Sequence, residues 1–115
     1  MTATEEQREV CTRFEAEPMP PASGEKVGLA YAVRSSTYPL HGLRHPPEHG
    51  TCGWYLWAGE PEVPDEDDFF EPVHVAHLST IRPEVEPYLA LPPGWRFVVG
   101  PDYEDVWYDP SLLEV

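Results

Sequence analysis

The alternation of large apolar residues with small or polar ones predicts four β-strands in this chain. Every second residue between 27 and 33 is large and apolar, which is typical of a strand over residues 26–34 with one buried face. Residues 53–59 are too aromatic for a loop and too few for a helix, so they predict a second strand. Residues 95–99 and 104–108 flank a Gly-Pro-Asp-Tyr turn sequence and predict a hairpin.

The faces of the first two strands differ in side-chain size. In residues 26–34 the second face carries only Gly28, Ala30 and Ala32, so we expect another element, such as the N-terminal helix, to pack closely over it. In the second strand the large side chains divide between the two sides, with Trp54, Leu56 and Ala58 on one and Tyr55 and Trp57 on the other.

Residues 1–17 predict an N-terminal helix. Thr4 and Gln7 have the spacing of a capping box, in which each side chain accepts a hydrogen bond from the other residue's backbone N–H. Three prolines between residues 18 and 21 then end the helix.

Helical character is also expected in the second half of the chain. It is predicted within residues 69–81, limited at its start by Pro72. Pro83 can begin another short helix, because its missing N–H falls in the unpaired first turn. Residues 35–52 are rich in proline, glycine and histidine and are expected to form a long loop. The fold predicted is therefore a single α+β domain, with an antiparallel sheet of about four strands and two or three helices packed on it.

Length and charge narrow the functional classes. At 115 residues the chain has room for one compact domain and no second core. It carries 21 acidic residues against seven basic ones, a formal charge of −14. Such a field repels nucleic acid and anionic membranes and attracts basic proteins. Solubility alone is the simpler explanation of the same charge.

The sequence favours a cytoplasmic protein. No early stretch has the basic flank and apolar core of a signal peptide, and no apolar run reaches the roughly 20 residues that a membrane span needs. Cys11 and Cys52 are too few for a disulfide framework, so we expect a reducing compartment and no bridge between them.

Metal and catalytic motifs are weak in this sequence, and neither a metal site, a cofactor nor an enzyme activity is predicted. His41, His45, His49 and Cys52 recur in one segment, but Pro46-Pro47 prevents a helix from placing them on one face. An HxxH pair, His74 and His77, lacks the glutamate of a metalloprotease motif. The chain has no GxSxG and no glycine-rich phosphate loop, and its acidic PDEDDFFE stretch lacks the glycine of a calcium loop.

Two acidic stretches without any basic residue are the strongest candidates for a binding surface. One runs from Glu60 to Glu71 and the other from residue 102 to the end, and aromatic residues accompany both. Aromatic anchors with a charged rim are typical of protein interfaces. The partner-binding residues predicted are Trp57, Glu60, Asp65, Glu66, Asp67, Asp68, Asp102, Tyr103, Glu104 and Asp105.

Three segments together carry a family resemblance. Residues 42–60 (GLRHPPEHGTCGWYLWAGE), 67–78 (DDFFEPVHVAHL) and 88–109 (YLALPPGWRFVVGPDYEDVWYD) resemble the immunity-protein 33-like domain of bacterial polymorphic and contact- or secretion-delivered toxin systems, type VI secretion among them. The resemblance covers roughly residues 25–113. Its most specific parts are the Gly53-Trp54-Tyr55 stretch and the LPPGWRF…DVWYD ending.

The resemblance implies a protein that binds a cognate toxin, and it supplies no catalytic residue. The excess of acidic residues fits a basic toxin such as a nuclease. We expect this chain to be a monomer or a weak dimer. The alternative is an acidic mimic of nucleic acid, or an anti-defence inhibitor, that occupies DNA- or RNA-binding grooves. A small metal-dependent enzyme is a third class. A mimic would inhibit several unrelated nucleic-acid-binding proteins, whereas an immunity protein would inhibit one toxin.

Overall fold

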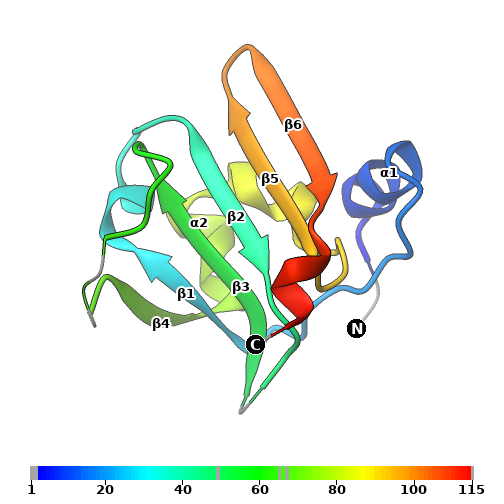
Figure 1. Cartoon of the computed structure of the whole chain (residues 1–115), viewed down its shortest axis with the longest axis horizontal. Helices are drawn as coiled ribbons and strands as arrows, with labels where there is room; N and C mark the ends of the chain where they lie inside the picture. The colour runs from blue at the N-terminus through cyan, green and yellow to red at the C-terminus, as the bar shows by residue number, and fades with distance from the viewer. Residues whose placement is uncertain (1–2, 49, 65, 67, 115) are drawn as a thin grey trace.

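A six-stranded mixed sheet forms the centre of the protein (Figure 1). The computed structural model describes residues 3–48, 50–64, 66 and 68–114. The strand order is β4-β1-β3-β2-β5-β6; β1 and β3 run parallel, and the other neighbours run antiparallel. The strands are β1 (Lys26–Ala30), β2 (Leu40–Arg44), β3 (Thr51–Ala58), β4 (Phe70–His74), β5 (Trp95–Gly100) and β6 (Tyr103–Tyr108).

The α+β class is confirmed, but the expected number of strands is too low. The hairpin β5–β6 and strand β3 lie where the sequence predicts them. The segment expected to be a long loop contains β2, and the region expected to begin a helix contains β4. Pro72 is tolerated in β4 because this strand lies at the sheet edge, where one side of the backbone needs no hydrogen-bond partner.

The first predicted strand is shorter than expected. Its second half forms a 3₁₀ segment, η1 (Tyr31–Arg34), after β1 ends at Ala30. The expectation that a helix packs over the small face of this strand is wrong. A Cβ added to Gly28 would lie 2.6 Å from the ring of Tyr55 and 3.3 Å from Cβ of Phe70, so aromatic side chains fill that space.

The two α-helices and the 3₁₀ segments between residues 75 and 88 lie on one side of the sheet, and the C-terminal 3₁₀ segment lies on the other. The α-helices are α1 (Glu5–Arg13) and α2 (Leu78–Ile81), and the other 3₁₀ segments are η2 (Val75–His77), η3 (Pro83–Tyr88) and η4 (Pro110–Leu113). In Figure 1, α2 and the yellow segment after it lie behind the sheet, while the red C-terminal turn lies in front. The capping box of Thr4 and Gln7 is confirmed, and the Gln7 amide also donates to the Glu86 carbonyl oxygen (3.0 Å) in η3.

The main core lies between the sheet and these helical segments. Its largest fully buried aromatic side chains are Trp54 and Phe97, whose ring centroids lie 5.5 Å apart. Strand β2 approaches them with Gly42, where a Cβ would meet the Phe97 ring at 2.2 Å. The indole N–H of Trp54 donates to the Leu89 carbonyl oxygen (2.9 Å), so the core aromatic also fixes the segment after η3.

A buried cation ties three segments to the centre of the sheet. Arg44 of β2 is 2% exposed and forms no ion pair with any carboxylate that the structure describes. Its Nη1 donates to the carbonyl oxygens of Met19 (2.7 Å) and Leu91 (2.8 Å), and its Nε donates to that of Cys52 (2.9 Å). Burial lowers the pKa of Arg44. The chain after α1 and the chain after η3 are thereby joined to β3.

Candidate partner-binding surface

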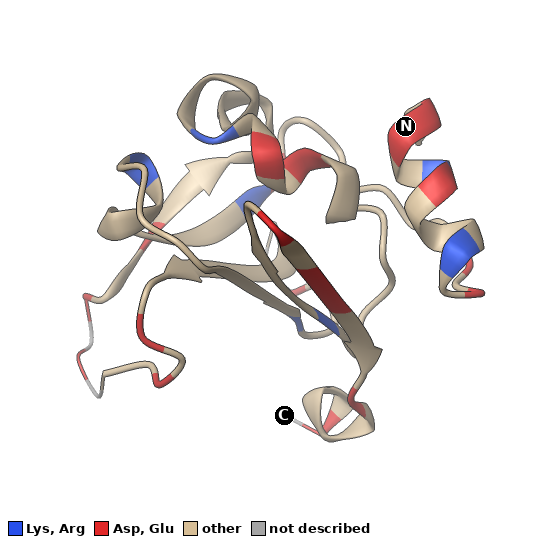
Figure 2. Cartoon of the chain, turned by 90° about the horizontal axis from the view of Figure 1, so that it is seen from above, with Lys and Arg blue, Asp and Glu red and all other residues tan. Residues whose placement is uncertain are grey.

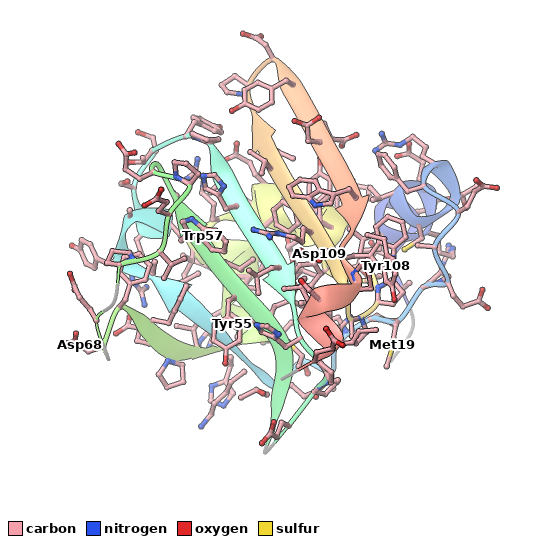
Figure 3. All side chains as sticks on the ribbon, viewed as in Figure 1. Met19, Tyr55, Trp57, Asp68, Tyr108 and Asp109 are labelled. Carbon is pink, nitrogen blue, oxygen red and sulfur yellow. The ribbon has the colours of Figure 1, made fainter. Side chains whose placement is uncertain are left out.

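The face of the sheet opposite the helices carries aromatic and apolar side chains. Strand register fixes which residues share it: His41 pairs with Trp57 and Leu43 with Tyr55 across β2 and β3. We call this side of the sheet the open face; it consists of His41, Leu43, Tyr55, Trp57, Phe70, Arg96, Val98 and Trp107. Figure 3 shows Tyr55 and Trp57 on the same side of β3.

Ring contacts order the part of the open face near β4. The ring of Trp57 stacks on His41 at 5.0 Å with an interplanar angle of 7°, and it meets Phe70 edge-on at 6.3 Å. Tyr55 also meets Phe70 edge-on, at 5.2 Å. The indole N–H of Trp57 donates to the Glu60 carbonyl oxygen (3.1 Å), which anchors the acidic loop to the aromatic cluster. Trp57 is itself 2% exposed, so it is a buried support of this surface.

A cavity of about 450 Å³ lies on the open face beside these rings. Its lining includes the aromatic side chains of Tyr55, Trp57 and Phe70 and the apolar side chains of Leu43, Pro46 and Val63. Gly53 and His45 also contribute to the wall. A cavity of this size, mostly apolar and with few polar groups, is typical of a binding site.

Gly53 keeps the strand close enough to β2 to shape the cavity wall. It has a φ of +94°, and a Cβ there would lie 1.8 Å from the carbonyl oxygen of His45. The His45 ring is held by a hydrogen bond from Nδ1 to the Leu112 carbonyl oxygen (2.9 Å) of η4. It also meets the ring of Tyr55 edge-on at 5.7 Å. The wall is therefore fixed by backbone and ring contacts.

The first acidic stretch forms the loop between β3 and β4. We define the acidic loop as residues 60–68; its carboxylates at Glu60, Glu62, Glu66 and Asp68 are exposed. None of these four forms an ion pair within the part of the chain that the structure describes. Asp65 and Asp67, predicted partner-binding residues, lie outside the described residues. The acidic loop borders the cavity through Val63, a loop residue that is 42% exposed and lines the cavity wall.

Strand β6 places the predicted residues Glu104 and Asp105 of the second acidic stretch on opposite faces of the sheet. Asp105 pairs with Val98 and lies on the open-face side, whereas the neighbouring Glu104 lies on the helical side. There Glu104 accepts hydrogen bonds from Arg13 of α1 and from the hydroxyl of Tyr88. The hydrogen bond from Arg13 is the main reason that the pKa of Glu104 is lowered. Glu104 thus joins α1 to the sheet and is not a free surface charge.

Asp102 and Tyr103 lie at the exposed tip of the β5–β6 hairpin. The Tyr103 ring packs over Gly100, where a Cβ would lie 2.6 Å from it, and 51% of the residue stays exposed. The acidic loop follows β3 towards the β4 edge, whereas β6 is the opposite edge of the sheet. Figure 2 likewise shows acidic positions spread over separate elements. In the residues that it describes, the structure does not bring the two predicted acidic stretches together.

The histidines of the proposed metal pattern are also kept apart. His41 lies on the open face, with Nε2 donating to the Gly59 carbonyl oxygen (2.9 Å), while Cys52 is a buried free thiol. His49 lies outside the described residues. His74 and His77 are exposed and lie edge-on, with ring centroids 5.6 Å apart. Within residues 3–48, 50–64, 66 and 68–114, no three His, Cys, Asp or Glu side chains gather as metal ligands would.

Together the fold and this surface define a small α+β domain with one face closed by helices and the other presenting an aromatic cavity beside unpaired carboxylates. None of its described helices has the length and apolar character to cross a membrane. Residues 6–109 match the family model of the Imm33-like domain, so the chain belongs to this family of immunity proteins. The match begins inside α1, earlier than the resemblance seen in the sequence. Neither the curated proteins nor the solved structures gave a significant match.

Proposed function

We propose that this chain is an immunity protein that binds one cognate antibacterial toxin through its open face and so neutralises it. Membership of the Imm33-like family supports the role. The observation that carries the choice of surface is the cavity on the open face, bordered by a loop whose described carboxylates are unpaired. Catalysis has no part in this function. The protein acts as a monomer or weak dimer in the cytoplasm, where it meets toxin delivered by neighbouring cells.

The charge of the chain supports a basic toxin. Like charges held together in a loop repel one another unless water or a partner compensates them. Several other carboxylates are already compensated internally, such as Glu71 by Arg34, Glu84 by Arg82 and Asp109 by Arg96. The acidic loop is therefore the described acidic segment with most charge left for a partner. A positive toxin would be attracted at long range and would lose this advantage in high salt.

Growth rescue tests this function. The reading frame upstream of this chain's gene is cloned, and the carboxy-terminal domain of its product is expressed in a bacterial host with and without this chain. We expect growth arrest by that domain alone, rescue by co-expression, and a one-to-one complex by isothermal titration calorimetry. If the domain arrests growth and this chain neither rescues nor binds it, the proposed function is wrong.

An inhibition assay with purified proteins separates this function from nucleic-acid mimicry. Purified chain is added to the upstream toxin domain and to a panel of unrelated DNA- and RNA-binding proteins. An immunity protein inhibits the toxin domain alone. Inhibition across the panel, with nucleic acid competing for the same sites, would support the mimic instead.

A further inference from the structure

We propose that the cavity on the open face receives a lysine or arginine side chain of the partner protein. This inference rests on the proposed function and names the chemistry of the group that the surface recognises. The cavity is lined by the aromatic rings of Tyr55, Trp57 and Phe70 and by the aliphatic side chains of Leu43 and Val63, and the exposed carboxylates of Glu60 and Glu62 lie in a hollow that adjoins it at Val63. A long cationic side chain has matching parts, because its methylene stem is apolar and its head is charged.

The charge around the cavity favours a cation. None of the described residues that line it is Lys or Arg. Val63 also lines an adjoining hollow, whose other residues include Glu60 and Glu62. The aromatic cavity and this acidic hollow therefore adjoin each other at Val63. A cation entering past Val63 would pass two exposed carboxylates before it reached the rings.

The rings themselves favour the same occupant. A cation within about 6 Å of an aromatic face is attracted by the negative electrostatic potential of that face, and Tyr55 and Phe70 are the half-buried rings that line the cavity. The edge-on arrangement of Phe70 against both Tyr55 and Trp57 fixes the rings without help from a ligand. A preformed cavity of this kind costs little ordering when a side chain enters it.

Charge also argues against a second copy of this chain as the occupant. Each copy carries a formal charge of −14, so two open faces brought together would repel. An apolar side chain from the partner would fit the rings but would leave the carboxylates of the acidic loop without a counter-charge. A basic side chain satisfies both parts of the surface.

Substitutions at Val63 test the charge of the occupant with little risk to folding, because this residue lies in an exposed loop. The dissociation constant for the upstream toxin domain is measured for Val63→Lys and Val63→Glu. A cationic occupant predicts binding about tenfold or more weaker for V63K and equal or tighter binding for V63E. The matched controls, Thr80→Lys and Thr80→Glu at an exposed position of α2, should bind like the wild type. Equal loss for V63K and V63E would overturn the cationic occupant.

A second arm probes the cavity without the toxin. Nα-acetyl-arginine methylamide, Nα-acetyl-lysine methylamide and the uncharged norleucine analogue are titrated into labelled protein, and the indole N–H signal of Trp57 is followed by NMR. We expect saturable shifts with the two cations and smaller ones with norleucine, all reduced by Phe70→Leu. Cations without effect, or norleucine acting equally, would overturn the inference. If the toxin arm fails for the wild type while this arm succeeds, the proposed function fails and the cation site stands.

Discussion

Replacing Arg44 by methionine should destabilise the protein, although the substitution removes a buried charge. Methionine has a similar length and fills the same space, but it donates no hydrogen bond. The carbonyl oxygens of Met19 and Leu91 lose the donor that Nη1 provides. The carbonyl oxygen of Leu89 keeps another donor, the Trp54 indole N–H. At least two carbonyl groups are therefore left without the bond they now have.

The magnitude follows from the cost of leaving such groups unpaired. Each buried acceptor that loses its partner costs about 1–3 kcal/mol. The Leu91 and Cys52 oxygens are buried, whereas Met19 is 45% exposed and its oxygen can bind water instead, so the total is about 2–6 kcal/mol. Removing the desolvation penalty of the guanidinium offsets part of this cost, as the lowered pKa of Arg44 indicates. We expect a net loss of about 3 kcal/mol, a large share of the 5–15 kcal/mol that is usual for a domain.

Urea unfolding followed by tryptophan fluorescence measures this loss, with the slope of the transition checked for two-state behaviour. Arg44→Lys is the informative companion, because a single ammonium cannot reproduce both the Nη1 and the Nε bonds. We expect it to lose stability as well. In the wild type, the Met19 N–H donates to the Ala90 carbonyl oxygen (2.7 Å). In both variants we expect this amide hydrogen to exchange faster with solvent. An Arg44→Met variant as stable as the wild type would show that the carbonyl bonds give no net stability.

Three further variants test other parts of the account. Gly53→Ala places a Cβ 1.8 Å from a backbone oxygen at a φ of +94°, so we expect a loss of about 3 kcal/mol or more by urea unfolding; a smaller loss than 1 kcal/mol would contradict the close approach. The hydrogen bond from Arg13 lowers the pKa of Glu104 in the folded protein. The ionised Glu104 carboxylate therefore stabilises the fold above the pKa of an unfolded glutamate, about 4.3, and this stabilisation is lost as the pH falls through the lower pKa of the folded state. The stability difference between wild type and Glu104→Gln should therefore shrink from pH 7 to pH 3, and a constant difference would contradict this. Asp68→Lys should slow association with the upstream toxin domain roughly threefold or more in low salt while leaving dissociation nearly unchanged, whereas Glu17→Lys, placed outside the acidic loop, should not.

The elements that sequence predicted best are those whose pattern is local. The β5–β6 hairpin is defined by a turn sequence between two aromatic runs, and β3 by its own aromatic content. Strand β2 has no such pattern, because its core-facing positions are Leu40, Gly42 and Arg44. A glycine under an aromatic ring and an arginine bound to distant carbonyl groups become interpretable as core only through contacts far away in sequence.

The candidate surface was predictable in part. The acidic loop was identified by its composition, and Trp57 by its proximity to that loop, although the structure buries Trp57 beneath the surface. Strand alternation alone could have placed Glu104 and Asp105 on opposite faces of β6, because successive side chains point to opposite sides. The cavity residue Val63 gave no signal in the sequence, since its role depends on how the loop returns over the sheet.

Hydrogen–deuterium exchange of this chain, alone and with the upstream toxin domain, tests the central claim most directly. If the open face is the binding surface, protection on binding should appear in β2, β3 and the acidic loop, and α1 and α2 should exchange as in the free protein. Protection confined to α1, α2 or η3, with none in β3 or the acidic loop, would show that the toxin binds the helical side and would contradict the account.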